Sequence, residues 1–104
     1  MRRAAKVDAN QGIIVSAFRA MGCPVLDLHR VGEDVPDLLV RIAGQNHFIE
    51  VKDGSLPPSA RRLSEGQRAF ANIWATVVIE SADQAIAMVN RLRRGTFEYL
   101  GRIL

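Results

Sequence analysis

The feature that most constrains the fold is a pair of apolar segments, residues 35–43 and 47–53, separated by a short polar turn. Gly44 and Asn46 tolerate the backbone of a tight turn, so we expect the turn at residues 44–46. Runs of this length and composition are typical of β-strands. The apolar residues of the two strands are Leu38, Leu39, Val40, Ile42, Phe48, Ile49 and Val51. The stretch therefore predicts an antiparallel hairpin.

Three charged residues interrupt this apolar hairpin. Side chains alternate across a strand, so Glu50 and Lys52 share one face, while Ile49 and Val51 share the core face. The hairpin also brings the start of its first strand, at Asp37, beside Glu50 and Lys52. Two carboxylates and the Val51 carbonyl are oxygen ligands suited to Mg²⁺, which takes its other ligands from water and substrate phosphate. The pattern indicates phosphodiester hydrolysis, with the lysine stabilising developing negative charge.

The choice of lysine at position 52 adds weight to this interpretation. Of the 14 basic residues, 12 are Arg, and only Lys6 and Lys52 are Lys. Arginine suits bidentate phosphate contacts, and this chain uses it nearly everywhere else. The alternative is an exposed ion pair between Glu50 and Lys52 on a half-exposed strand, which would contribute little to stability.

Pro36-Asp37 followed by Glu50-Val51-Lys52 resembles the PD-(D/E)XK nuclease motif. With residues 63–67 opening the next helix, the chain looks most similar to the VRR-NUC and archaeal-type Holliday junction resolvase branch, over roughly residues 8–90. The resemblance implies an α/β, restriction endonuclease-like αβββαβ core with a mixed central sheet flanked by helices. It also implies DNA cleavage that depends on Mg²⁺ or Mn²⁺, often by a homodimer. Asp37, Glu50 and Val51 would bind metal, and Lys52 would assist catalysis.

Two further site candidates have competing structural explanations. Members of this family commonly place an acid from the first helix near the metal, and the chain offers Asp8, Asn10 or Gln11 but no Glu there. Asp8 is the metal candidate, although Asp8 and Gln11 also fit a helix-capping pair. Gln67 is the catalytic candidate implied by the resemblance, although Ser64 and Gln67 fit a capping box equally well.

Candidate DNA contacts lie in two basic segments. The loop after the second hairpin strand is rich in Gly and Pro and ends in Arg61 and Arg62, which are placed to hold phosphates. The first seven residues include Arg3 and Lys6 and suggest a mobile basic arm. The alternatives are an exposed connection and a solvated tail. A net charge of +3 mildly favours an anionic partner.

The remaining chain predicts three helices and two more strands. A first helix should cover residues 8–21 and end at Gly22, and a strand should follow over residues 23–31. Residues 75–81 read as a central buried strand. The last helix should begin at Ser81 or Asp83. Residues 96–104 form an extension that we expect to contact a partner subunit, the alternative being that it packs on its own domain. Each helix has an expected buried face. These are Ile13, Ile14, Ala17, Phe18 and Met21 in the first helix; Ala69, Phe70, Ile73 and Trp74 in the helix that begins at Ser64; and Ala85, Ile86, Met88, Val89 and Leu92 in the last helix.

Composition bounds the class of protein. A chain of 104 residues with 48% hydrophobic content fits a single domain over residues 1–104, which the resemblance implies is a nuclease domain. Cys23 is the lone cysteine, so no disulfide framework exists. The absence of a long apolar run predicts a cytoplasmic protein without membrane contact. His47 has no partner at metal-ligand spacing, which argues against zinc.

The sequence thus predicts a divalent-metal-dependent DNA endonuclease, structure-specific on branched DNA if it follows the resolvases it resembles. One alternative is a DNA-binding or phage structural module that retains the fold without catalysis. A basic helical regulator is a weaker alternative, because no helix-turn-helix with an exposed basic recognition helix is apparent. The preferred DNA structure stays open among junctions, flaps, duplex and single strands.

Overall fold

The computed structural model describes the backbone of residues 10–103 and the side chains of residues 10–95. The fold is α/β, with three α-helices and a four-stranded mixed sheet in these residues. A short 3-10 turn lies between β3 and α2. In chain order, the elements are α1 (Gln11–Ala20), β1 (Val25–Asp27), β2 (Leu38–Ile42), β3 (Gln45–Val51), the 3-10 turn (Pro58–Ala60), α2 (Glu65–Ile73), β4 (Thr76–Ile79) and α3 (Ala82–Ile103).

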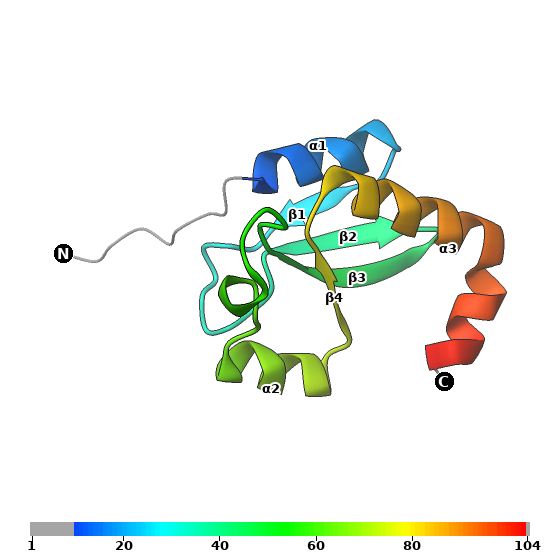
Figure 1. Cartoon of the computed structure of the whole chain (residues 1–104). Helices are drawn as coiled ribbons and strands as arrows, with labels where there is room; N and C mark the ends of the chain where they lie inside the picture. The colour runs from blue at the N-terminus through cyan, green and yellow to red at the C-terminus, as the bar shows by residue number, and fades with distance from the viewer. Residues whose placement is uncertain (1–9, 104) are drawn as a thin grey trace.

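The strands follow the order β1-β2-β3-β4 across the sheet. The pairs β1/β2 and β2/β3 are antiparallel, whereas β3 and β4 are parallel and are connected through α2. Helices α1 and α3 cover one face of the sheet, and α2 lies on the other (Figure 1). The side chains of alternate strand residues therefore meet two different environments.

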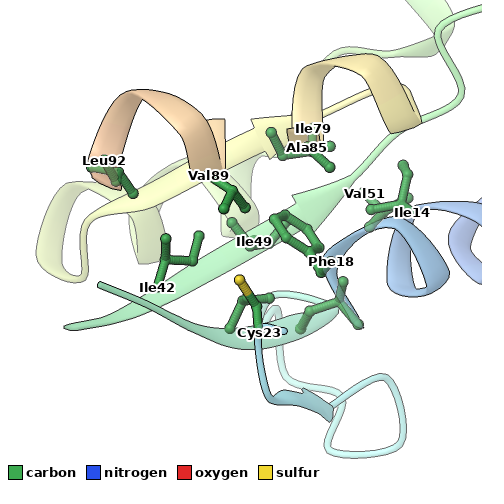
Figure 2. Close-up of a cluster of buried hydrophobic side chains, with 12 residues drawn as sticks. Ile14, Phe18, Cys23, Ile42, Ile49, Val51, Ile79, Ala85, Val89 and Leu92 are labelled. Atoms are coloured by element: carbon green, nitrogen blue, oxygen red, sulfur yellow. The ribbon is translucent and has the colours of Figure 1, made fainter. Parts of the chain in front are cut away.

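The hydrophobic core fills the space between the sheet and the α1/α3 layer (Figure 2). Ile49 and Val51 are fully buried there, which confirms their predicted place in the core. Phe18 is the largest fully buried side chain. The core residues are Ile14, Phe18, Cys23, Leu38, Val40, Ile42, Ile49, Val51, Ile79, Ala85, Val89 and Leu92.

The hairpin forms as predicted, but its turn lies earlier than residues 44–46. Ile42 pairs with Gln45, so the two turn residues are Ala43 and Gly44. Their φ angles of 51° and 81° are both left-handed, as a type I′ turn requires. Asn46 belongs to β3 and pairs with Arg41. The prediction started the turn at Gly44 because glycine readily adopts left-handed φ angles. In the structure the turn starts one residue earlier, at Ala43, and alanine is a less usual residue for this conformation.

The first helix and strand are both shorter than predicted. Gly22 ends the α1 region with a φ of 80°, as expected, but Ile13 is 61% exposed and does not belong to the buried face. Strand β1 has three residues rather than nine, and Leu26 and Val31 are exposed. As the edge strand, β1 is paired along one side only, and its apolar residues do not all face the core.

Strand β4 is not the central, buried strand that its β-branched sequence predicted. It pairs with β3 alone and forms the other edge of the sheet. Only Ile79 is buried, and Thr76, Val77 and Val78 are partly exposed. The sequence indicated a strand, but the position of a strand in a sheet depends on which neighbours the connections leave available.

Two helical faces also differ from the prediction. Ala69, Ile73 and Trp74 were expected to be buried with α2 but are exposed, Ile73 at 76% and Trp74 at 56%. In α3 the predicted burial of Ala85, Val89 and Leu92 is confirmed, whereas Ile86 is exposed. The backbone remains helical to Ile103 apart from a kink at Gly95, so the predicted extension continues α3 up to that residue. Any contacts made by the side chains of residues 96–104 lie outside the described part.

No helix in the described range combines the length and apolar character needed to cross a membrane.

Candidate active site

The hairpin register brings Asp37 opposite Glu50. Leu38 pairs with Ile49, and extending the antiparallel register by one residue places Asp37 beside Glu50. Asp37 Oδ2 accepts a hydrogen bond of 2.8 Å from the Val51 amide, and its carbonyl accepts one of 2.7 Å from Leu28 N. Because both its side chain and its backbone are bonded, this carboxylate has a fixed position at the end of the β2/β3 ladder.

Gln67, at the start of α2, connects Glu50 with Lys52. Its Nε2 lies 3.3 Å from Glu50 Oε2, and its Oε1 lies 3.1 Å from Lys52 Nζ. Glu50 is only 5% exposed, although it carries an ionisable group. Buried ionisable groups require polar partners, which the Gln67 amide supplies. One side chain thus holds the predicted acid and the predicted lysine together.

Gln67 also forms the capping box that the sequence predicted as the alternative. Its backbone amide donates to Ser64 Oγ, and its Oε1 accepts from Ser64 N at 2.9 Å. A carbonyl oxygen has two lone pairs, so Oε1 can accept from Ser64 and Lys52 at once. The two explanations do not compete, because the one side-chain amide makes both sets of bonds.

The start of α1 lies at the same end of β3 as these residues. The Asn10 side-chain amide donates to the Lys52 carbonyl at 2.8 Å and to the Glu80 carbonyl at 3.0 Å. Gln11 follows it and is 3% exposed, and no hydrogen-bond donor of the described residues reaches its Oε1. Among the first-helix candidates, Asn10 and Gln11 both offer a buried side-chain oxygen without a donor among the described residues, and Asn10 also donates through its amide. Asp8 lies outside the described residues.

The loop after β3 holds its arginines in different ways. Arg61 Nη1 pairs with Glu80 Oε2 at 2.9 Å, and its Nε donates to the Leu56 carbonyl. Arg62, in contrast, is exposed. Of the two predicted DNA contacts in this loop, Arg61 is engaged within the chain and Arg62 faces solvent. The predicted contacts Arg3 and Lys6 lie outside the described residues.

The first residues of this loop form a local turn beside Lys52. Asp53 Oδ1 accepts hydrogen bonds from the Ser55 amide at 2.9 Å and from the Ser55 hydroxyl at 2.6 Å. These two bonds lower the pKa of Asp53, because they stabilise its charged form. Within this turn, the Gly54 amide still donates to the Glu80 carbonyl at 3.3 Å, so the chain stays beside the end of β4 as far as Gly54.

Sequence reasoning missed a contact between the loop before β2 and α2. Gly32, Glu33 and Asp34 all have positive φ angles, of 72°, 57° and 65°. The Asp34 carboxylate lies against Gly66, so closely that a methyl group on Gly66 would overlap it. Only the glycine in an otherwise polar helical turn hinted at this close approach.

The donor set fits a hard divalent cation. Asp37 and Glu50 supply carboxylates, and Val51 supplies a backbone carbonyl. A carboxylate has about four lone-pair sites, so the bond from the Val51 amide does not prevent Asp37 from binding metal. Within residues 10–95, no three His, Cys, Asp or Glu side chains gather into a metal-holding group. Mg²⁺ needs only one or two carboxylates, because it keeps several waters and binds substrate oxygens.

Comparisons with protein-family models, with curated proteins and with solved structures found nothing that matches this chain.

Proposed function

We propose that this chain is a divalent-metal-dependent DNA endonuclease with a PD-(D/E)XK, restriction endonuclease-like core. The observation that carries the proposal is the connected set at one end of the β2/β3 hairpin. Asp37 stands opposite Glu50, and the Gln67 amide joins Glu50 to Lys52. This set places oxygen ligands suited to a hard cation beside an ammonium group that can contact phosphate.

Each residue has a distinct role in this proposal. Asp37, Glu50 and the Val51 carbonyl hold Mg²⁺ or Mn²⁺, which when bound supplies Lewis-acid polarisation of a phosphoryl oxygen. Lys52 stabilises the negative charge that grows on the scissile phosphate. Gln67 positions Glu50 and Lys52 relative to each other. Asn10 and Gln11 are the first-helix residues that can add an oxygen, since the side-chain oxygen of each is buried without a donor among the described residues.

The substrate is proposed to be branched DNA, by analogy with the resolvases that the motif resembles. A homodimer would present two such sites to the two strands that a junction resolvase must cut. Arg62 is exposed and is therefore the better phosphate contact of its pair. Arg61 would first have to release Glu80.

The direct test is cleavage of labelled four-way junction, flap, duplex and single-stranded DNA in Mg²⁺, Mn²⁺ or EDTA. We expect cutting in metal only, with a preference for branched substrates. Asp37→Asn and Lys52→Ala should each lower the cleavage rate by roughly 100-fold or more, because they remove a metal ligand and a charge at the reacting phosphate. Asp83→Asn, in the exposed first turn of α3, is the matched control and should cut normally.

Three outcomes would count against the proposal. Cutting that survives both site substitutions would place the chemistry elsewhere. Cutting in EDTA would exclude a metal-dependent mechanism. Binding of DNA without cutting in either metal would favour the non-catalytic module of the same fold.

A further inference from the structure

The face of the sheet that carries α2 has an apolar surface next to the candidate site. Leu26 pairs with Leu39, and Leu39 pairs with Phe48, so these three side chains form a row on one face. Helix α2 lies on this side, opposite α1 and the first part of α3 (Figure 1), and none of its residues is fully buried. Leu26 at one end of the row and Trp74 at the other are both more than half exposed.

Three aromatic rings make up the part of this surface nearest α2. Phe48 and Phe70 meet edge to face, with ring centroids 5.3 Å apart and an interplanar angle of 89°. Trp74 lies 6.4 Å from Phe48 and 6.3 Å from Phe70. The two phenylalanines are partly buried, and they support an indole ring that is 56% exposed. We call Phe48, Phe70 and Trp74 the aromatic platform.

The aromatic platform adjoins the candidate site along β3. Phe48 and Glu50 are two residues apart on the same face, a separation of about 6.6 Å along a strand. On the other side of Phe48 along the sheet, the exposed Arg41 bonds to Asn46 through Nη1 and Oδ1 at 2.9 Å. The face therefore carries a guanidinium, an aromatic ring and the acidic site in succession.

We propose that the aromatic platform binds an unpaired nucleobase of the DNA whose backbone reaches the candidate site. Every base has a π-face, so stacking on an exposed indole is favourable for any sequence. Arg41 supplies a charge for the neighbouring phosphate. The inference rests on the proposed nuclease function and deepens it. The site then acts where a strand leaves a duplex, as at a flap or an open junction, because paired bases cannot reach Trp74.

A second copy of this chain is a poorer occupant of the same surface. Glu50 is two residues from Phe48 on the same face of β3. A protein partner that covered Phe48 would therefore also cover Glu50 and would prevent a phosphodiester from reaching the site. A stacked base avoids this conflict, because its own backbone delivers the phosphate. The most exposed ring of the aromatic platform is the Trp74 indole, which suits the flat face of a base.

Trp74 is the chain's single tryptophan, so its fluorescence reports on the platform directly. The full chain is titrated in EDTA, without turnover, with oligothymidylate of about ten nucleotides and with blunt duplex of equal length. We expect saturable quenching by the single strand and none by the duplex. Anisotropy of labelled oligothymidylate should show about tenfold weaker binding by Trp74→Ala, which corresponds to the loss of one stacked base.

Two matched variants make the result specific. Ile73→Ala removes an even more exposed apolar residue from the same helix end and should bind like wild type. Trp74→Phe keeps an aromatic ring and should recover most of the affinity lost in Trp74→Ala. A circular dichroism melt of each variant confirms that it is folded.

Several results would overturn the proposal. Equal affinity of Trp74→Ala and wild type, or equal quenching by duplex, would exclude base stacking. Trp74 emission that changes with protein concentration alone, with a doubled mass that Trp74→Ala abolishes, would assign the surface to a second copy. Asp37→Asn separates the two proposals: if it cuts DNA normally, the nuclease site is wrong, while quenching of its Trp74 still reports on stacking.

Discussion

At the scale of single residues, the site depends on the amide of Gln67. This side chain makes hydrogen bonds to Glu50, Lys52 and the Ser64 amide, which uses three of the four that an amide can form. The same residue therefore has two separable effects. Its bonds with Ser64 stabilise the start of α2, and its bonds with Glu50 and Lys52 position the charged groups.

Substitutions at Ser64 and Gln67 should separate these effects. Ser64→Ala removes the cap oxygen and should lower the free energy of unfolding by about 1 kcal/mol without changing kcat. Gln67→Ala should cause a similar loss of stability and, under the proposed function, also lower kcat about 10- to 100-fold, because Gln67 orients the proposed metal ligand Glu50. Urea unfolding and cleavage assays on the same preparations provide both values.

Gln67→Glu refines the comparison, because it keeps an acceptor for Ser64 N and Lys52 but has no N–H to donate to Glu50. We expect it to lose activity while retaining the capping box. If Ser64→Ala and Gln67→Ala lowered kcat equally, Gln67 would act on the site only by capping α2.

At the scale of elements, α2 depends on a close approach by the loop before β2. This loop has three successive residues with left-handed φ angles, a conformation that costs energy for Glu33 and Asp34. Asp34 packs against Gly66 at the second position of α2. The loop and the helix therefore fix each other's positions, and the loop leads directly to Asp37.

A pair of glycine substitutions tests this contact. Gly66→Ala should destabilise the protein by about 1–3 kcal/mol, because the new methyl group overlaps the Asp34 carboxylate and must displace it. Gly12→Ala, at the same second position of α1, meets no atom within 4 Å and should stabilise by up to about 1 kcal/mol. Thermal or urea unfolding measures the stability change of each variant. Equal changes for Gly66→Ala and Gly12→Ala would mean that the Asp34 carboxylate moves aside without loss of stability.

At the scale of the whole molecule, stability should fall as the solution is acidified. His47 lies on β3 opposite Val40 and is 8% exposed. Its burial lowers its pKa below the ordinary value of 6.5, so the unfolded chain takes up the proton at a higher pH than the folded chain does. His47 therefore favours folding fully above about pH 6.5, and this contribution is lost as pH falls through the depressed folded pKa.

Urea unfolding at about pH 7.5 and about pH 5.5 should show this loss in wild type and a smaller one in His47→Gln. A constant loss of stability in His47→Gln does not affect this comparison, because the change between the two pH values is compared within each protein. An identical fall in wild type and His47→Gln would assign the acid sensitivity to other groups.

How much the sequence predicted follows from the range of the interactions involved. The hairpin, its core residues Ile49 and Val51, and the approach of Asp37 to Glu50 depend on strand alternation and one tight turn, which are local. The edge position of β4 and the exposure of Trp74 depend on which surfaces the other elements cover. The periodicity of apolar residues in the sequence does not reveal this arrangement. The sequence left the role of Gln67 open between helix capping and the site. A local sequence pattern cannot reveal that one amide bonds to Ser64 and also to Glu50 and Lys52.

The absence of fully buried residues in α2 has a consequence for how the site is maintained. A helix without fully buried side chains can unfold locally at a lower free energy than global unfolding requires. Such a local opening exposes the backbone amides of the helix to hydrogen exchange. Each such opening withdraws Gln67 and disconnects Glu50 from Lys52. A cation or DNA that needs the assembled site should therefore slow exchange in α2 before it shifts the global unfolding midpoint. The lifetime of the closed helix sets the lifetime of the intact site.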